Sequence, residues 1–97
     1  MTGNVQTIRV MIVGDVQGVW FRKWTVKTAR SLGLGGWVRN RRNGAVEAVF
    51  SGSNSDVKMK IMLERCHDGP SAARIDLVTV VAWNDRAEFE FRQLPTV

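Results

Sequence analysis

The spacing of apolar residues is the feature that most limits the fold of this chain, because it changes between two periods. Ile8, Val10 and Ile12 alternate with their neighbours, as residues of a β-strand do. From Phe21 to Leu32 the apolar and small residues instead recur every three or four positions, and Gly33 follows as a natural helix stop. The first third of the chain therefore predicts a strand followed by a helix.

Two further strand-like runs and a second helix are expected in the middle of the chain. Residues 36–42 and 45–52 flank Asn43-Gly44, a strong short-range signal for a β-hairpin. Ser55 next to Asp56 marks the start of the second helix. Its apolar face is formed by Met59, Met62, Leu63 and Cys66.

The end of the chain supplies the remaining strands. Residues 75–83 are rich in β-branched side chains, residues 84–86 have the composition of a turn, and phenylalanines alternate with glutamates over 87–92. The resulting order is βαββαβ with a short last strand. Such an order favours an α+β, ferredoxin-like sandwich, in which an antiparallel sheet carries both helices on one face.

Size and composition are consistent with one domain. The chain has 97 residues, of which 44% are hydrophobic, so we expect a flexible tail over 1–6 and a single domain over 7–97. The net charge of +5 favours an anionic substrate or partner. The single cysteine, the lack of a signal-peptide pattern and the short apolar runs predict a cytoplasmic protein that does not enter a membrane.

The stretch from Gly14 to Arg22 lies where the first strand meets the first helix, and its composition suits an anion. Gly14 and Gly18 allow a tight turn that points several N–H groups at one place. The first helical turn adds unpaired donors and a positive dipole end. Arg22 opposes that dipole at a cost of roughly 0.3–1 kcal/mol unless an anion lies beside it. The residues therefore predict an anion-binding loop.

Two segments carry a resemblance to a known family. The run Gly-Asp-Val-Gln-Gly-Val-Trp-Phe-Arg at 14–22 resembles the first signature of the acylphosphatases. Gly-Trp-Val-Arg-Asn at 36–40, followed by Gly44, Val46 and Gly52, is similar to the second. Smaller similarities to stand-alone bacterial members occur at residues 32–34, 66, 69–70 and 73–76. The resemblance covers nearly the whole chain, from Val10 to Phe91.

The resemblance implies a hydrolase that needs neither metal nor cofactor and cleaves acyl phosphates, the mixed carboxyl-phosphate anhydrides, to carboxylate and inorganic phosphate. Arg22 is then the phosphate-binding arginine, and Asn40 positions the attacking water. The phosphate is also bound by the backbone N–H groups of Asp15, Val16, Gln17, Gly18, Val19, Trp20 and Phe21. We expect the substrate to be a small molecule, inorganic phosphate to be both product and inhibitor, and the protein to be a monomer.

Elementary chemistry is consistent with a site that has two catalytic side chains and no general acid. The leaving carboxylate has a conjugate acid of pKa about 4, so it departs at neutral pH without a general acid. Asn40 shares a strand face with Val38, where a buried polar side chain costs free energy unless it forms hydrogen bonds. Its amide can both accept a hydrogen bond from a water and donate one to it. The proton of that water is expected to pass to a phosphate oxygen of the substrate.

Two other functions agree with parts of the sequence. A basic sheet with Trp20, Trp37 and Trp83 could bind RNA as an RNA-recognition motif does, yet the chain lacks the signature run of that motif. We therefore do not expect nucleic-acid binding. The second alternative is an inactive regulatory domain of the same type, against which the presence of Arg22 and Asn40 argues.

Three further polar residues have structural interpretations. We expect His67 on the surface of the second helix, Cys66 in the core rather than as a nucleophile, and Gln17 as a side chain that holds its loop together. One histidine and one cysteine are too few for a Cys/His metal site.

Overall fold

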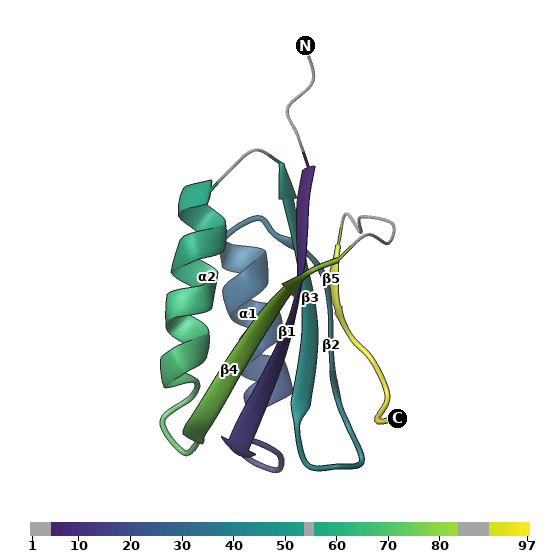
Figure 1. Ribbon diagram of the computed structural model, residues 1–97, viewed down its shortest axis with the longest axis vertical. Coiled ribbons are helices and arrows are strands. Elements are labelled where there is room, and N and C mark those ends of the chain that lie inside the picture. The colour runs from purple at the N-terminus through teal and green to yellow at the C-terminus, as the bar shows by residue number, and fades with distance from the viewer. Residues whose placement is uncertain (1–4, 54–55, 84–89) are drawn as a thin grey trace.

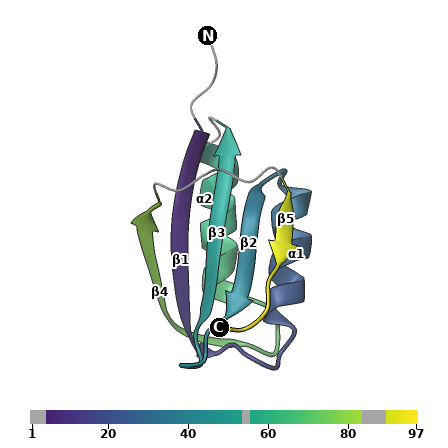
Figure 2. The ribbon, with the colours of Figure 1, turned by 90° about the vertical axis from the view of Figure 1, so that its right-hand side faces the viewer.

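A sheet and a pair of helices form two layers in the computed structural model, which describes residues 5–53, 56–83 and 90–97 (Figure 1). Both helices cover the same face of the sheet, as Figure 2 shows from a second direction. The α+β, ferredoxin-like arrangement expected from the sequence is therefore confirmed. The elements of the described residues are β1 (Val5–Asp15), α1 (Phe21–Ser31), β2 (Gly35–Asn40), β3 (Val46–Ser53), α2 (Asp56–Asp68), β4 (Arg74–Ala82) and β5 (Phe91–Gln93).

The strand order across the sheet is β4-β1-β3-β2-β5. The pairs β1–β4, β1–β3 and β2–β3 are antiparallel, but β5 pairs with β2 in parallel. The sheet is thus mixed, whereas the sequence predicts an antiparallel one. The physical reason is the path of the chain: β4 and β5 lie at opposite edges and run in opposite directions. Since β2 also runs opposite to β4, β5 meets it in parallel.

The element boundaries follow the expected ones closely, with small shifts. Helix α1 begins at Phe21 and ends before Gly33, whose φ of 70° suits a glycine. Strand β1 begins at Val5, so Val5 and Gln6 belong to the strand rather than to a tail. The last strand covers Phe91–Gln93 among the described residues, and 87–89 of the expected 87–92 lie outside them. The expected turn at 84–86 and the expected helix start at Ser55 lie outside the described residues.

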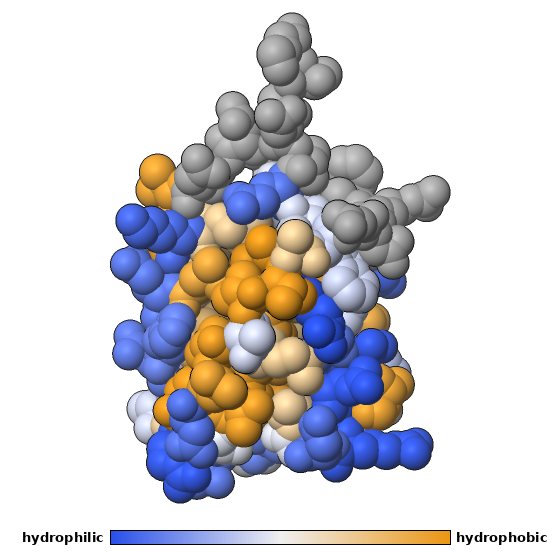
Figure 3. Space-filling model, viewed as in Figure 1, coloured by the Kyte–Doolittle hydropathy of each residue, from blue (hydrophilic) through white to orange (hydrophobic). Residues whose placement is uncertain are grey.

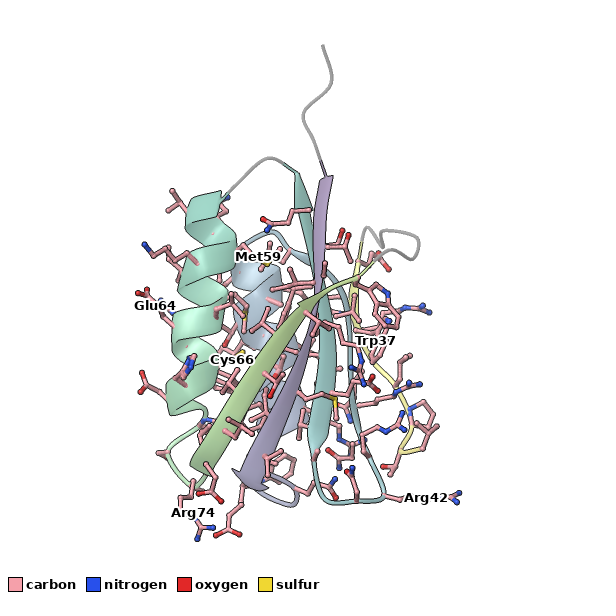
Figure 4. The ribbon with its side chains drawn as sticks, viewed as in Figure 1. Trp37, Arg42, Met59, Glu64, Cys66 and Arg74 are labelled. Atoms are coloured by element: carbon pink, nitrogen blue, oxygen red, sulfur yellow. The ribbon has the colours of Figure 1, made fainter. Side chains whose placement is uncertain are left out.

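The hydrophobic core lies between the helices and the sheet. Figure 4 shows Met59 and Cys66 of α2 pointing toward the sheet, whereas Glu64 points away from it. Burial raises the pKa of the Cys66 thiol to about 12, so the group stays protonated at neutral pH and is part of the core, as predicted. The sheet contributes every second residue of its central strands, namely Ile8, Val10, Ile12, Val46, Ala48 and Phe50.

An ion-pair cluster covers the face of the sheet that the helices leave open. The Glu47 side chain of β3 is only 3% exposed, and its carboxylate accepts hydrogen bonds from Arg9 Nε at 2.6 Å and Arg39 Nε at 2.8 Å. Arg41 Nη1 lies 3.2 Å away. Burial raises the pKa of Glu47, but hydrogen bonds from Arg39 and Arg9 outweigh it and leave the pKa below its usual value.

Two of these arginines also cover tryptophan rings. Arg39 Cζ lies 4.6 Å from the ring centroid of Trp37, and Arg9 Cζ lies 5.9 Å from that of Trp83. Figure 4 shows Trp37 on the side of the sheet away from α2. Base stacking would need these ring faces, and the protein's own guanidinium groups lie over them. The absence of nucleic-acid binding stays a prediction.

The edge strand β4 is only partly covered. Figure 3 shows hydrophobic side chains gathered over this strand and its neighbour β1. The exposed apolar residues among them are Val13, Leu77, Val80 and Val81. Val13, Leu77 and Val81 share the alternation of Arg9 and therefore lie on the face opposite the helices, whereas α2 packs against β4 from the other side.

We expect Glu47→Gln to lower the free energy of unfolding by about 1–3 kcal/mol at neutral pH, because three arginines lose their charged acceptor. The folded-state pKa of Glu47 is lower than the reference value of 4.5. The contribution of the charge is therefore complete above about pH 4.5 and is lost as the pH falls through the folded-state pKa. Urea unfolding of both proteins across this range measures it. A stability difference that does not shrink in acid would contradict the role of the charge.

Candidate active site

The loop between β1 and α1 begins at a β-bulge. The register between β1 and β4 shifts between Val13 and Gly14. Gly14 has φ 146°, and a side chain there would collide with the backbone carbonyl of Arg74. Gly18 has φ 76° with open space around it, so it is needed for its backbone conformation. Gly14 thus permits close strand pairing, whereas Gly18 permits the turn of the loop.

Helix α1 begins without a conventional cap. Trp20 precedes it in the left-handed region, with φ 64°, and its side chain makes no capping hydrogen bond. The first turn contains no acidic residue but does contain Arg22 and Lys23. The first N–H groups of a helix have no acceptor within the helix, so this end presents donors, a positive dipole end and two cations together.

Asn40 ends strand β2 opposite Val46 of β3. Val38 and Asn40 share the face that points toward the helices, as the alternation predicts. The Oδ1 atom of Asn40 is buried and receives no hydrogen bond from the described residues. A buried carbonyl oxygen without a donor costs about 1–3 kcal/mol. The atom is therefore suited to accept a hydrogen bond from a small molecule such as water.

One pocket of about 340 Å³ is lined by both expected catalytic residues, Arg22 and Asn40. Val16 and Phe21 are buried, whereas Trp20 and Lys23 are exposed, so the first two form the floor and the last two the rim. The lining residues are Val16, Gly18, Trp20, Phe21, Arg22, Lys23, Asn40 and Gln93.

Three of the expected loop residues do not line the pocket with their side chains. The Asp15 carboxylate forms an exposed ion pair with Arg74 at 2.8 Å. Val19 packs against the core. The Gln17 Nε2 group donates hydrogen bonds to the carbonyl oxygens of Arg41 at 2.6 Å and Ala45 at 2.9 Å. Gln17 therefore holds the loop against the β2–β3 hairpin, as predicted from the sequence.

The segment after β5 supports the other side of the pocket. Leu94 N–H donates to the Val38 carbonyl at 2.8 Å, and Val97 N–H donates to the Asn40 carbonyl at 3.1 Å. Arg22 Nη1 donates to the Leu94 carbonyl across a longer distance of 3.4 Å. Figure 2 shows the C-terminus beside the end of β2. This segment therefore fixes the backbone at Asn40 and contacts Arg22.

Sequence reasoning did not identify two of the lining residues. Lys23 follows Arg22 and lies off the buried face of α1, which by itself indicates only a solvated lysine. Gln93 reaches the pocket because β5 pairs in parallel with β2, which sets Gln93 opposite Val38. A long-range pairing of this kind leaves no signal in the local sequence.

Other candidate residues lie away from the pocket. His67 is exposed on α2, with Nδ1 2.9 Å from the Leu63 carbonyl oxygen, as expected for a surface residue. Within the described residues, no three His, Cys, Asp or Glu side chains are grouped closely enough to hold a metal ion. Neither described helix is long and apolar enough to cross a membrane.

The sequence and structure match known proteins over nearly their full length. The acylphosphatase family model matches residues 8–93. An acylphosphatase of Rhodospirillum rubrum is 52% identical over 87 residues, which cover 88% of this chain and 93% of that protein. One from Nitrobacter winogradskyi is 50% identical over 95 residues, covering 92% and 94%. The solved structure of an acylphosphatase from Coxiella burnetii is 34% identical, with a TM-score of 0.86 and 94% of each chain covered.

We expect Gln17→Ala to lower the free energy of unfolding by about 1–2 kcal/mol, because two part-buried carbonyl groups each lose the side-chain donor that they accept beside a backbone one. Gln17→Glu should cost at least as much, since a carboxylate cannot donate to a carbonyl oxygen. Urea denaturation of the three proteins measures both effects. Unchanged stability in both variants would show that this side chain does not hold the loop.

Proposed function

This chain belongs to the acylphosphatase family and hydrolyses acyl phosphates, and we propose that Arg22 and Asn40 divide the reaction between them. Arg22 and the loop before α1 bind the phosphoryl group, and Asn40 orients the attacking water. The observation that carries this division is the buried Oδ1 atom of Asn40. It receives no hydrogen bond from the described residues, and Asn40 lines the same pocket as Arg22.

The phosphoryl group is bound by charge and by backbone donors. A planar guanidinium can donate two parallel hydrogen bonds to phosphate oxygens, and with the described residues Arg22 makes one long hydrogen bond, to the Leu94 carbonyl. The N–H groups at the start of α1 add donors and a positive dipole end. The proposal includes the N–H groups of Asp15, Gln17 and Val19, because a backbone N–H can face a ligand while its side chain points elsewhere.

The attacking water is held by Asn40, whereas Arg22 binds the phosphoryl group. The water donates a hydrogen bond to Asn40 Oδ1, which leaves an oxygen lone pair for attack on phosphorus. The bond from phosphorus to the acyl oxygen breaks, and its electron pair leaves on the carboxylate. The proton of the water passes to a phosphate oxygen, giving inorganic phosphate. Asn40 is too weak a base to take this proton itself.

The chemistry of the leaving group explains why two side chains suffice. A carboxylate with a conjugate acid of pKa about 4 departs without protonation. Phosphoryl transfer requires little covalent chemistry from the enzyme. Positioning of the reactants and stabilisation of the equatorial phosphoryl oxygens can therefore supply most of the rate enhancement. The reaction proposed here therefore uses neither a metal ion nor a cofactor.

Inorganic phosphate occupies the phosphoryl site in this proposal, so it is expected to inhibit competitively as well as to be a product. The substrate is a small acyl phosphate. The monomeric state and the cytoplasmic location stay predictions from the sequence.

We expect Arg22→Ala and Asn40→Ala each to reduce turnover of benzoyl phosphate by about 10²–10³, the range for loss of one preorganised donor. Arg22→Lys should recover only part of the loss, because an ammonium cannot form a bidentate fork. Steady-state hydrolysis in a buffer that contains a chelator and no added metal measures these rates.

Matched controls come from the neighbouring hairpin. Arg42 is exposed, and Asn43 accepts a hydrogen bond from Ala45 N–H within the turn, so neither lines the pocket. Arg42→Ala and Asn43→Ala should keep turnover within about threefold of the wild type. If the controls lose as much activity as Arg22→Ala and Asn40→Ala, or if the latter variants unfold, the assigned roles are wrong.

A further inference from the structure

The rim of the pocket carries positive charge beyond that of Arg22. Trp20 is 75% exposed and Lys23 is exposed as well, yet both line the pocket whose floor contains Val16 and Phe21. A substrate whose phosphoryl group lies at Arg22 and the loop must extend its acyl group toward the open side. Lys23 and Trp20 are therefore placed to contact the acyl group rather than the reacting phosphorus.

The side chain of Lys23 is held in place without being neutralised. Its Nζ atom lies 5.5 Å from the centroid of the Trp20 ring, a cation–π contact. Within the described part of the chain it forms no ion pair, and the first turn of α1 contains no carboxylate. Arg9, Arg39 and Arg41 instead share Glu47. Lys23 thus presents an uncompensated ammonium at the entrance.

The backbone at Trp20 reinforces this arrangement. A tryptophan with φ 64° is conformationally costly, by about 1–2 kcal/mol on the scale for L-residues in the left-handed region. Its ring gains little from burial, since the residue is 75% exposed. What the ring does contact is the Lys23 ammonium. The unfavourable backbone conformation of Trp20 therefore places its ring where it orients the Lys23 ammonium beside the pocket.

We infer that the pocket selects acyl phosphates whose acyl group carries a second negative charge, recognised by Lys23 at the rim. The inference rests on the proposed placement of the phosphoryl group at Arg22. Among the described residues, the pocket lining contains Arg22 and Lys23 and no acidic side chain that would repel a second anion. Both a carboxylate and a phosphate ester provide the required charge.

The test compares two rigid substrates of nearly equal shape, 4-carboxybenzoyl phosphate and its neutral isostere 4-carbamoylbenzoyl phosphate. The quantity measured is the ratio of their kcat/KM values, because it cancels any effect of Lys23 on the phosphoryl group. Lys23→Met should lower this ratio about threefold at low ionic strength, the size expected for one exposed charge pair. The difference between wild type and variant should shrink in about 0.5 M salt.

The matched control is Lys27→Met, which removes the same charge one turn further along α1 at an exposed residue outside the pocket lining. It should leave the selectivity ratio unchanged. An equal ratio in wild type and Lys23→Met would overturn the inference, as would an equal loss in both lysine variants, which would indicate a general field effect. Wild-type turnover of 4-carbamoylbenzoyl phosphate, whose acyl group is neutral, and its loss in Arg22→Ala, test the proposed function separately.

Discussion

Two hydrogen bonds from the Gln17 side chain join the two halves of the site. One half is the loop that leads into α1 and Arg22, and the other is the turn of the β2–β3 hairpin, which follows Asn40. Catalysis by positioning loses much of its effect when groups are misplaced by about 1 Å. The two Gln17 hydrogen bonds therefore contribute more by aligning these segments than by their own contribution to stability. The central strand β3 completes the alignment, since it pairs with both β1 and β2.

The cationic side chains occur in two different electrostatic environments. On the open face of the sheet, Glu47 neutralises part of an arginine cluster and connects three strands. At the pocket, Arg22 and Lys23 stand at the positive end of α1 with no carboxylate in the same turn. The first arrangement stabilises the fold. The second leaves a local excess of positive charge, which an anionic substrate compensates when it binds.

The parts of this structure that local sequence determines could be predicted, and those that depend on distant pairing could not. The helical period from Phe21 and the Asn43-Gly44 turn fix the order of elements, and strand alternation places Asn40 on the inner face. The direction of β5, and with it the position of Gln93, depends on pairing with β2 at the far edge of the sheet. Alternation also places Glu47 on the open face, but its burial arises from arginines on neighbouring strands.

The division of roles between the loop and the strand is tested most directly by the affinity of Asn40→Ala for inorganic phosphate. If Arg22 and the loop bind the phosphoryl group while Asn40 binds only the water, this variant should bind phosphate within about twofold of the wild-type Kd although its turnover is largely lost. Isothermal titration calorimetry measures the Kd, with Arg22→Ala as the variant expected to lose binding. A loss of phosphate affinity in Asn40→Ala as large as that in Arg22→Ala would contradict the account.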